Sequence, residues 1–464
     1  AAIDESGYVF PKKRVIISLA PSDKKKSGSH FDLAMAIGVL QQNGDIGAKN
    51  IEDYGFIGEL SLNGQLRACR GILPMIIAGQ KKGIHKIIVP EQNLREAMLV
   101  QGVEILGFSC LRDVIAYLEG KISKRTECSK DNTDSGILGY TLDFSEVKGQ
   151  EDLIEAVVLA AAGGHNMLMI GEPGCGKTMI AQRIPTILPE MTEEECLEVT
   201  KIYSISGMLP NGHALIKFRP FRAPHHNASL NALIGGGVNA MPGEVSLAHN
   251  GVLFLDELAE FSRRTLDALR QPVEDKKVCI SRVNGTHTFP SNFMFVTAMN
   301  PCPCGYYPGT KCRCTDYEVL KYRGKISGPI MDRIDIQKEV HPVNFFEITG
   351  ETTGYSSELL RKKVEIARKI QQERYSDQAG VNCNAQMTTA LIQKYCELDQ
   401  EYLKLLRKTS EEYGYSARVI HKLLRLARTS ADIDKEEKIR LQDIRKVLDC
   451  RDLDKSNSKM VVVK

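Results

Sequence analysis

Apolar residues in the first 120 positions alternate between short uninterrupted runs and helical spacing. The runs predict strands and the spacing predicts helices, in the order strand 15–19, helix 31–40, strand 54–60, helix 72–81, strand 86–89 and helix 94–100. Strands that alternate with helices in this way predict a small α/β domain over residues 1–120. Residues 121–138 are polar and lack periodicity, so we expect a linker there.

The remaining residues form two further patterns. Residues 139–350 again alternate strands and helices, with apolar strands expected at 167–170, 251–255 and 293–299. Residues 351–464 have helical spacing with charged faces, and an apolar stripe runs through Val419, Leu423, Leu424 and Ala427. We therefore expect an α/β multidomain protein with a parallel-sheet domain, a C-terminal helical lid domain and a frayed tail from Asp452.

A phosphate-binding loop follows the first of these apolar strands. The segment from Gly171 to Thr178 has the spacing G-x-x-x-x-G-K-[ST], in which the glycines let successive backbone N–H groups point at phosphate oxygens. Lys177 can then reach the β- and γ-phosphates of ATP, and the Thr178 hydroxyl can bind Mg²⁺. The residues expected around the nucleotide are Gly171, Glu172, Pro173, Gly174, Cys175, Gly176, Lys177, Thr178 and Met179.

Polar residues directly follow the other two apolar strands. Asp256 and Glu257 come after 251–255, where Asp256 can hold Mg²⁺ through water and Glu257 can polarise the attacking water. Asn300 comes after 293–299, and its amide can orient that water. Because open α/β sheets act at the carboxyl ends of their strands, these side chains are expected beside the phosphate-binding loop.

The composition indicates an ordinary globular protein and does not identify a binding partner. The 464 residues are 42% hydrophobic and 26% charged, as in an ordinary globular protein. The net charge of +3 is so small that nucleic-acid binding must depend on local placement of basic residues. No apolar run approaches the roughly 18 residues of a membrane span, so no membrane partner is expected. The 13 cysteines favour a reducing cytoplasm, and the start at Ala1 without Met leads us to expect preceding sequence.

Four of the cysteines gather in one short segment. Cys302, Cys304, Cys312 and Cys314 form the pattern C-x-C-x₇-C-x-C. Four thiolates at this spacing can wrap one tetrahedral Zn²⁺, although the spacing is tighter than the usual C-x₂-C. Disulfides or free thiols are the alternatives, and a reducing compartment disfavours disulfides. We expect a structural zinc site.

Two segments near the apolar strands predict projecting loops. Asn284-Gly285 lies between two β-type runs within 276–290, which is a strong hairpin signal. The glycine-rich segment Gly235–Gly243 precedes strand 251–255 and is expected to form a second loop. The pair His225-His226 can bind a metal or a nucleotide, but packing is the favoured interpretation.

The phosphate-binding loop and the polar strand ends resemble the AAA+ ATPases. Asn300 resembles sensor 1 of that family, Arg333 within 327–335 resembles its arginine finger, and Arg418 within 414–418 resembles sensor 2. The resemblance implies that Arg333 reaches the γ-phosphate of a neighbouring subunit, and therefore that subunits assemble into a ring. The alternatives are an Arg333–Asp335 structural pair and a solvated helical Arg418.

Residues 15 to about 118 resemble the Lon-protease C-terminal fold. The resemblance lies in the stretches 26–36, 57–60, 64–73 and 87–93. Lon uses a Ser nucleophile with a Lys base, and those two positions fall here at His30 and Leu73. Leu73 cannot accept a proton, so the resemblance implies a Lon-like fold without protease chemistry. His30 is expected to be a relic, a core residue or a contact residue.

Longer motifs narrow the resemblance further. The two loops are similar to the hairpins of the helix-2-insert AAA+ group, which includes magnesium chelatase ATPases and MCM helicases. The stretches 221–226, 242–258, 270–275 and 298–305 resemble the ComM/YifB proteins, and this resemblance covers essentially the whole chain. It implies a homo-hexameric ATP-driven DNA translocase or helicase that promotes branch migration in recombination during natural transformation. Its implied partners are single-stranded and branched DNA, with recombination proteins as further candidates.

In such rings the hairpins face the pore, which suggests where DNA binds. The candidate contacts are Arg282, His287, Lys276, Lys277 and Asn239, which six copies would concentrate on a phosphate backbone. Two other functions are kept open. One is a chelatase-type chaperone that remodels a protein or porphyrin–metal partner, and the other is a Lon-type protease, which the missing Ser and Lys disfavour.

Overall fold

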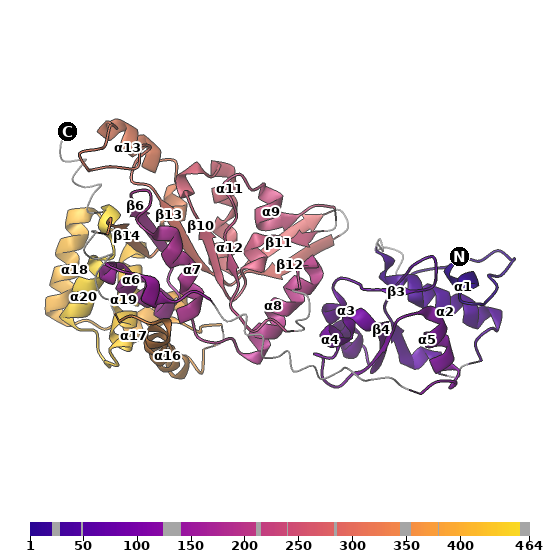
Figure 1. Ribbon diagram of the computed structural model, residues 1–464. Coiled ribbons are helices and arrows are strands. Elements are labelled where there is room, and N and C mark those ends of the chain that lie inside the picture. Colours follow the sequence, from indigo (N-terminus) through magenta and orange to yellow (C-terminus); the bar gives the residue numbers. More distant parts are fainter. Residues whose placement is uncertain are drawn as a thin grey trace. The chain divides into compact units, whose positions relative to one another are not determined.

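The chain folds into two compact units in a computed structural model (Figure 1). The first unit consists of Ala1–Gly136, Thr192–Lys217 and Ser281–His287, and the second of Ile137–Met191, Phe218–Ile280 and Thr288–Lys464. The structure describes residues 1–20, 28–47, 50–123, 141–209, 215–238, 240–282, 285–343, 354–378 and 380–454. Most of the expected linker 121–138 and most of the expected tail lie outside these ranges.

The first unit is built on a parallel sheet of the order β1-β4-β5. Its strands are β1 (Tyr54–Phe56), β4 (Lys86–Pro90) and β5 (Glu104–Phe108), and an antiparallel pair joins β2 (Glu59–Leu60) to β3 (Leu66–Arg67). Its helices include α1 (Ala2–Glu5), α2 (Asp32–Asn43), α3 (Ile72–Lys81), α4 (Leu94–Ala97) and α5 (Leu111–Leu118). Alternation along β4 gives the sheet two apolar faces: Ile88 packs with α2 and α5, whereas Ile87 and Val89 pack with α3.

Helix α8 (Glu193–Ser206) also belongs to the first unit. A capping box between Thr192 and Glu195 starts this helix. Leu197 packs against the same apolar cluster as α3, and the backbone N–H of Gly71 donates to the carbonyl of Ser204 at 3.0 Å. Residues that follow the phosphate-binding loop in the sequence therefore complete the core of the N-terminal unit.

Three sequence predictions in this unit need correction. Residues 15–19 form no strand, and Ile16 is 78% exposed, because no strand lies beside them in the described part of the chain. The strand expected at 54–60 is broken after Phe56, and the chain then passes close to Leu66 at Gly58, where a Cβ would lie 2.9 Å from the Leu66 side chain. The helix expected at 94–100 ends at Ala97.

The second unit contains a five-stranded parallel sheet of the order β14-β6-β13-β10-β7. Its strands are β6 (Met167–Gly171), β7 (Phe221–Arg222), β10 (Val252–Leu255), β13 (Met294–Met299) and β14 (Ile336–Val340). The central strands β6, β10 and β13 are buried at every position, which explains their uninterrupted apolar sequences. The prediction of an α/β fold with a parallel sheet is therefore confirmed.

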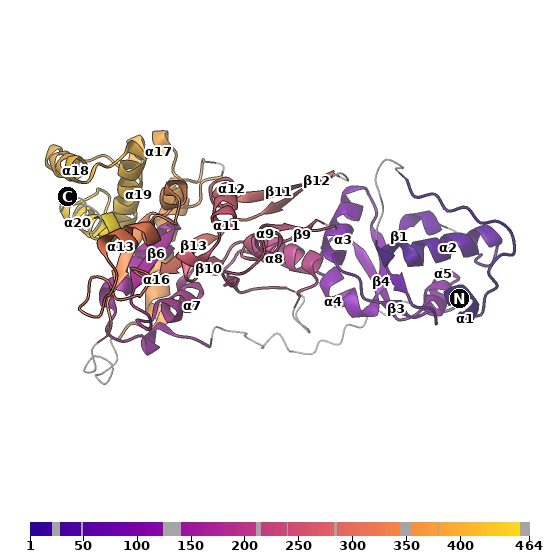
Figure 2. The same cartoon turned by 90° about the horizontal axis from the view of Figure 1, so that it is seen from above.

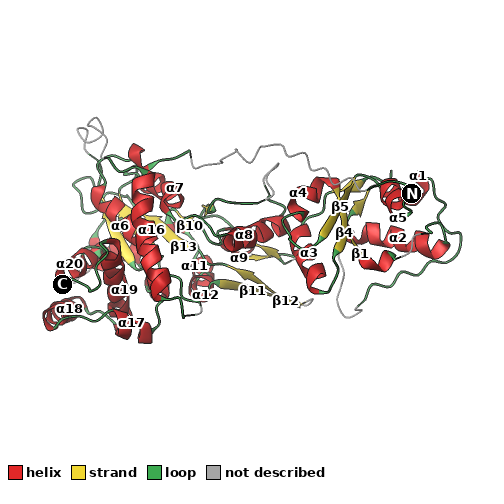
Figure 3. Ribbon diagram, turned by 90° about the horizontal axis from the view of Figure 1, so that it is seen from below, coloured by secondary structure: helices red, strands yellow, loops and turns green. Residues whose placement is uncertain are grey.

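Helices accompany this sheet and continue to the C-terminus (Figure 3). The helices of the sheet region are α6 (Glu151–Gly163), α7 (Lys177–Ile187), α9 (Leu230–Ile234), α10 (Glu244–Leu247), α11 (Arg263–Ala268), α12 (Arg270–Asp275), α13 (Asp316–Arg323) and α14 (Gly328–Met331). The C-terminal helices are α16 (Ser357–Arg374), α17 (Thr389–Tyr395), α18 (Gln400–Tyr413), α19 (Ala417–Ile433) and α20 (Leu441–Leu448). No helix of the described residues is long and apolar enough to cross a membrane.

The C-terminal helices share one hydrophobic core with the sheet region. Val364 of α16 and Leu426 of α19 are buried in the same cluster as Val157 of α6, and the three helices lie side by side (Figure 3). Within the expected stripe of α19, Leu423 and Ala427 are buried and Val419 and Leu424 pack partly buried against the cluster. The C-terminal helices are therefore packed on the sheet region by apolar contacts.

Two hairpins interrupt the second half of the sheet domain. Strands β11 (Lys277–Arg282) and β12 (Gly285–Pro290) pair as a two-stranded ribbon, as the Asn-Gly signal predicts (Figure 2). The glycine-rich segment forms a second, minimal pair from β8 (Gly235–Gly236) and β9 (Met241–Pro242). Asn239 and Asn284 lie outside the described residues.

Candidate functional site

The phosphate-binding loop connects the end of β6 to the start of α7. Gly174 and Gly176 have φ angles of 80° and 92°, which are conformations that L side chains rarely adopt. A Cβ at Gly171 would lie 2.4 Å from the carbonyl oxygen of Val340, so only glycine fits at the start of the loop. The Lys177 ammonium group donates to the carbonyls of Gly171 at 2.8 Å and Glu172 at 2.9 Å. The loop therefore has the tight curl that its sequence predicts.

The ends of two further strands bring polar side chains to this loop. The Thr178 hydroxyl donates to Asp256 Oδ2 at 2.6 Å, directly beyond β10. The Lys177 Nζ donates to Asn300 Oδ1 at 3.4 Å, directly beyond β13. Because β13 lies between β6 and β10 in a parallel sheet, their carboxyl ends meet at one edge. The arrangement of a lysine, a hydroxyl, a carboxylate and an amide suits a magnesium–triphosphate group.

Glu257 has an unusual backbone conformation beside this group. Its φ of 51° lies in the left-handed region, which costs a non-glycine residue about 1–2 kcal/mol. Its carboxylate Oε2 lies 3.2 Å from Nδ1 of His226, whose ring lies edge-on to Phe261. The strained turn thus places the Glu257 carboxylate against an imidazole that comes from the segment after β7.

Arg333 is tied to residues of its own chain. Its guanidinium pairs with Glu274 and donates to the carbonyls of Arg270 at 3.1 Å and Pro329 at 2.7 Å. Arg333 therefore pairs with Glu274 and not with Asp335, which was the alternative. Asp335 instead lies 3.7 Å from the ammonium group of Lys422 on α19.

Arg418 lies in the first turn of α19, as the sequence predicts. Its side chain is 81% exposed, and its Nη1 lies 3.9 Å from Asp332 Oδ2. At this exposure and distance the pair contributes little to stability. The Arg418 side chain is therefore available for contacts outside its own chain segment.

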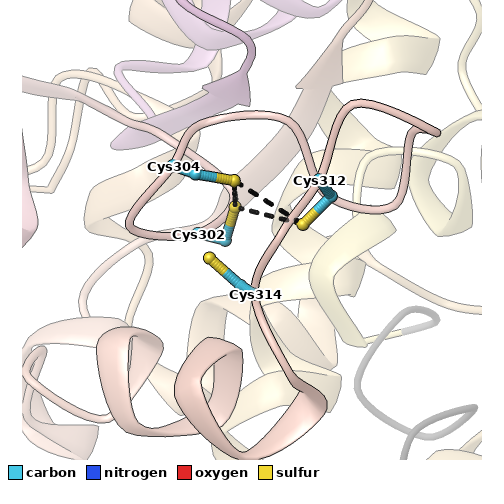
Figure 4. Close-up of side chains that lie close together, drawn as sticks. All are labelled: Cys302, Cys304, Cys312 and Cys314. Carbon is cyan, nitrogen blue, oxygen red and sulfur yellow. Dashed lines mark hydrogen bonds between the residues drawn. The ribbon is translucent and has the colours of Figure 1, made fainter.

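The four clustered cysteines converge on one point (Figure 4). Their Sγ atoms all lie within 4.8 Å of one another, and the closest separations are 3.3 Å between Cys302 and Cys304, 3.6 Å between Cys304 and Cys312, and 3.8 Å between Cys302 and Cys312. A tetrahedron of sulfurs about 2.3 Å from a zinc ion has edges of about 3.8 Å. Backbone N–H groups of Arg313 and Tyr306 point at Cys304 and lower its pKa to about 6. The cluster fits a tetrahedral metal site.

The candidate DNA contacts separate into exposed and covered residues. Lys277, Arg282 and His287 are exposed on the β11–β12 hairpin. Lys276, which directly follows α12, is half-buried, and its ammonium group is turned toward the Phe293 carbonyl and ring. Burial lowers the pKa of Lys276. Among the cysteines that the structure describes, Cys279 of β11 is the one that is exposed.

Comparison with known proteins places these features in one family. Sequence models of the magnesium chelatase subunit ChlI match residues 1–93 and 143–348, and its C-terminal model matches residues 354–451. The competence protein ComM of Haemophilus influenzae is 41% identical over 443 residues, covering 95% of this chain and 86% of ComM. The protein YifB of Escherichia coli is 41% identical over 460 residues, covering 98% of this chain and 88% of YifB.

The chain belongs to the ComM/YifB family of magnesium-chelatase-like proteins. The AAA+ character of this family implies ATPase activity with ATP and Mg²⁺. The polar edge at Lys177, Thr178, Asp256 and Asn300 fits ATP and Mg²⁺, since it pairs a cation with the Asn300 amide and a hydroxyl with the Asp256 carboxylate.

This ComM/YifB protein also has a shorter similarity to a Lon protease. Archaeal Lon protease of Methanocaldococcus jannaschii is 26% identical over 103 residues, which are 22% of this chain and 16% of that protein. Leu73 is fully buried in α3, and His30 is half-buried with its ring 4.0 Å from that of Phe31. Desolvation lowers the pKa of His30.

Two residues at the site of this ComM/YifB protein escaped sequence reasoning. His226 was expected to pack or to bind a ligand, whereas its closest ionisable partner is Glu257. The signal was its position shortly after β7, whose carboxyl end lies at the same edge as that of β10. Glu274, the partner of Arg333, gave no signal, because it is one acidic residue among many on short helices.

Proposed function

We propose that the protein is an ATP-driven, ring-forming motor that moves DNA and promotes branch migration during natural transformation. The observation that carries the proposal is the assembled edge of Lys177, Thr178, Asp256 and Asn300 in a chain that is 41% identical to a competence protein along 95% of its length. Integration of transforming DNA requires the incoming strand to be exchanged with a resident one, and a hexameric ATPase that translocates on single-stranded and branched DNA can extend such an exchange.

Each polar group at the edge has a role that its chemistry suits. Lys177 and the loop N–H groups hold the phosphates, while Thr178 and Asp256 hold Mg²⁺. Glu257 acts as the base that polarises water, and Asn300 orients that water. His226 lies within hydrogen-bond distance of Glu257 and positions its carboxylate. Bound ATP supplies the phosphoryl group whose transfer to water drives the motor.

Ring formation follows from the role assigned to Arg333. Arg333 reaches the nucleotide of the neighbouring subunit, which requires it to leave Glu274. Arg418 contacts the γ-phosphate from the lid, and its exposed side chain supports this role. Both interactions bring a guanidinium to the charge that develops in phosphoryl transfer.

DNA binding is assigned to the exposed residues of the β11–β12 hairpin. We expect Arg282→Ala to weaken the binding of single-stranded DNA about tenfold, which is about 1.4 kcal/mol, and to reduce its salt dependence, because phosphate contacts are lost. ATP hydrolysis without DNA is expected to stay at the wild-type rate. Titration of fluorescent DNA at several salt concentrations measures both quantities.

The matched control is Arg407→Ala. Arg407 is another exposed arginine, 82% accessible, but it lies on helix α18 and pairs with Glu411. Equal DNA affinities for the wild type and the two variants would remove the hairpin from the binding surface. Absence of both DNA binding and DNA-stimulated hydrolysis in the wild type at low salt would contradict the motor itself.

We further propose that Cys302, Cys304, Cys312 and Cys314 hold one structural zinc ion. The separations of 3.3–3.8 Å among the sulfurs of Cys302, Cys304 and Cys312, with the Cys314 sulfur within 4.8 Å of them, support a tetrahedral S₄ site. We expect elemental analysis of the purified protein to find about one zinc per chain, and removal of that zinc to lower the melting temperature by several degrees. A protein that carries no zinc and keeps its full melting temperature contradicts this assignment.

A chelatase-type chaperone is the second candidate function, favoured by the matching magnesium chelatase models. It would use the same nucleotide chemistry to remodel a protein or porphyrin–metal partner. This function gives no role to the cysteine cluster. It also gives none to the N-terminal unit, which we propose to be a Lon-like fold without protease chemistry. Hydrolysis that responds to DNA favours the motor, whereas indifference to DNA favours the chaperone.

A further inference from the structure

The cysteine cluster lies in a loop that begins at the nucleotide site. Asn300, which contacts Lys177, is separated from Cys302 by a single proline. The loop ends at Thr315, whose side chain caps the N-terminus of α13 through Glu318. The residues between them, 301–314, are called the cysteine loop below. Its first limb continues directly from a side chain assigned to hydrolysis.

The cysteine loop also rests on the phosphate-binding loop. A Cβ built at Gly305 would lie 2.8 Å from Cγ and Cδ of Pro173. A Cβ at Gly309 would lie 3.7 Å from the Glu172 carboxylate. The backbone of the cysteine loop therefore approaches Pro173 more closely than a side chain at Gly305 would allow, and at Gly309 it is within ordinary contact of Glu172. A displacement of this backbone therefore alters the contact between the cysteine loop and the phosphate-binding loop.

The bonds that shape the cysteine loop are mostly local, apart from those at sulfur. Its backbone hydrogen bonds from Gly305 to Cys302, from Gly309 to Tyr306, and from Cys312 to Gly309 each span three residues. The Arg323 guanidinium donates to the Pro301 carbonyl at 3.2 Å and lies 5.7 Å from the centre of the Tyr307 ring. The limb 302–304 meets the limb 312–314 at the four sulfurs. A metal at that point joins the two limbs.

We propose that zinc in this cluster braces the cysteine loop against Pro173 and Asn300, so that metal occupancy sets the competence of the nucleotide site. The inference rests on the proposed ATPase function. Zinc joins the limbs 302–304 and 312–314, the joined loop presents the Gly305 backbone to Pro173, and its first limb fixes Asn300 opposite Lys177. The zinc ion has a structural role: it lies away from the phosphates and takes no part in the hydrolysis.

Two variants test the brace from opposite ends. Cys312→Ser removes one ligand, and we expect it to lose most of its zinc, bind a fluorescent ATP analogue several-fold more weakly and hydrolyse ATP at least tenfold more slowly. Gly305→Ala keeps all four ligands but adds a methyl group against Pro173. We expect it to retain about one zinc per chain and still show the weaker nucleotide binding and slower hydrolysis.

Each variant has a matched control that is expected to behave as the wild type. Cys69→Ser removes a free thiol of the N-terminal unit. Gly380→Ala introduces a Cβ at a similar φ of 81°, where nothing lies within 4 Å. If Cys312→Ser fails to fold, Gly305→Ala still measures the contact with Pro173, because it leaves the ligands in place.

The outcomes separate the brace from the motor. A zinc-free Cys312→Ser protein, or a Gly305→Ala protein, that binds and hydrolyses ATP like the wild type overturns the brace. A wild-type protein without zinc overturns it as well. A wild type that binds zinc and the ATP analogue but hydrolyses no ATP contradicts the proposed function instead, and nucleotide affinity in the two variants then still decides the brace.

Discussion

Arg333→Ala is expected to lower ATP turnover by about 10³–10⁵-fold while ATP binding persists. An arginine finger supplied by a neighbouring subunit is worth this much in phosphoryl transfer, because it neutralises charge that develops only in the transition state. Single-turnover and steady-state hydrolysis, measured beside nucleotide affinity, distinguish this loss from weakened binding. Turnover that stays within a few-fold of the wild type would mean that Arg333 is only a structural residue.

The ion pair between Arg333 and Glu274 provides the control for this experiment. Glu274→Gln breaks the same pair but keeps the guanidinium, so we expect turnover to be maintained or raised. Mixing tests whether the finger acts between subunits. An Arg333→Ala chain can bind ATP and a Lys177→Ala chain still carries the finger, so a mixture of two inactive variants is expected to regain hydrolysis. A finger that acts within its own chain predicts no recovery.

Glu257→Gln is expected to have the second largest effect. Loss of a positioned base lowers the rate by about 10²–10⁴-fold, whereas the amide preserves the size and the position of the side chain. We expect the variant to bind ATP with unchanged affinity and to hold it, so that nucleotide-dependent assembly and DNA binding become easier to observe. Rapid filtration with radiolabelled ATP measures how long the uncleaved nucleotide is retained.

Glu260 offers a matched carboxylate for comparison. It lies three residues after Glu257, in the same turn, but it pairs with Lys325 at 3.5 Å, away from His226. Glu260→Gln is therefore expected to hydrolyse ATP at nearly the wild-type rate. Similar losses in both variants would indicate that the turn tolerates no amide, and Glu257 would then lose its assignment as the base.

Elements with strong local signals could be predicted from the sequence. The helix expected at 72–81 has those bounds in the structure, because its apolar spacing begins after Gly71 and ends at charged residues. The central strands β6, β10 and β13 were equally clear, since strands buried on both faces are uninterrupted apolar runs. Their polar successors then had to meet at one edge of the sheet, whatever the order of the strands.

Features that depend on distant partners could not be predicted. Residues 15–19 read as a strand, but a strand also needs a neighbour for its backbone groups, and the apolar pattern does not reveal whether one is present. Lys276 looked like a free cation at a hairpin base, and only the fold shows that it turns toward Phe293. The assignment of α8 to the N-terminal unit likewise depends on its packing against α3.

The exposed thiol of Cys279 makes the hairpin open to direct observation. The other cysteines that the structure describes are at least partly covered, and those of the cluster would be protected by a bound metal. A maleimide dye should therefore attach first to the ribbon that carries Arg282. The fluorescence of the attached dye would report whether the β11–β12 ribbon shifts during each cycle of ATP hydrolysis.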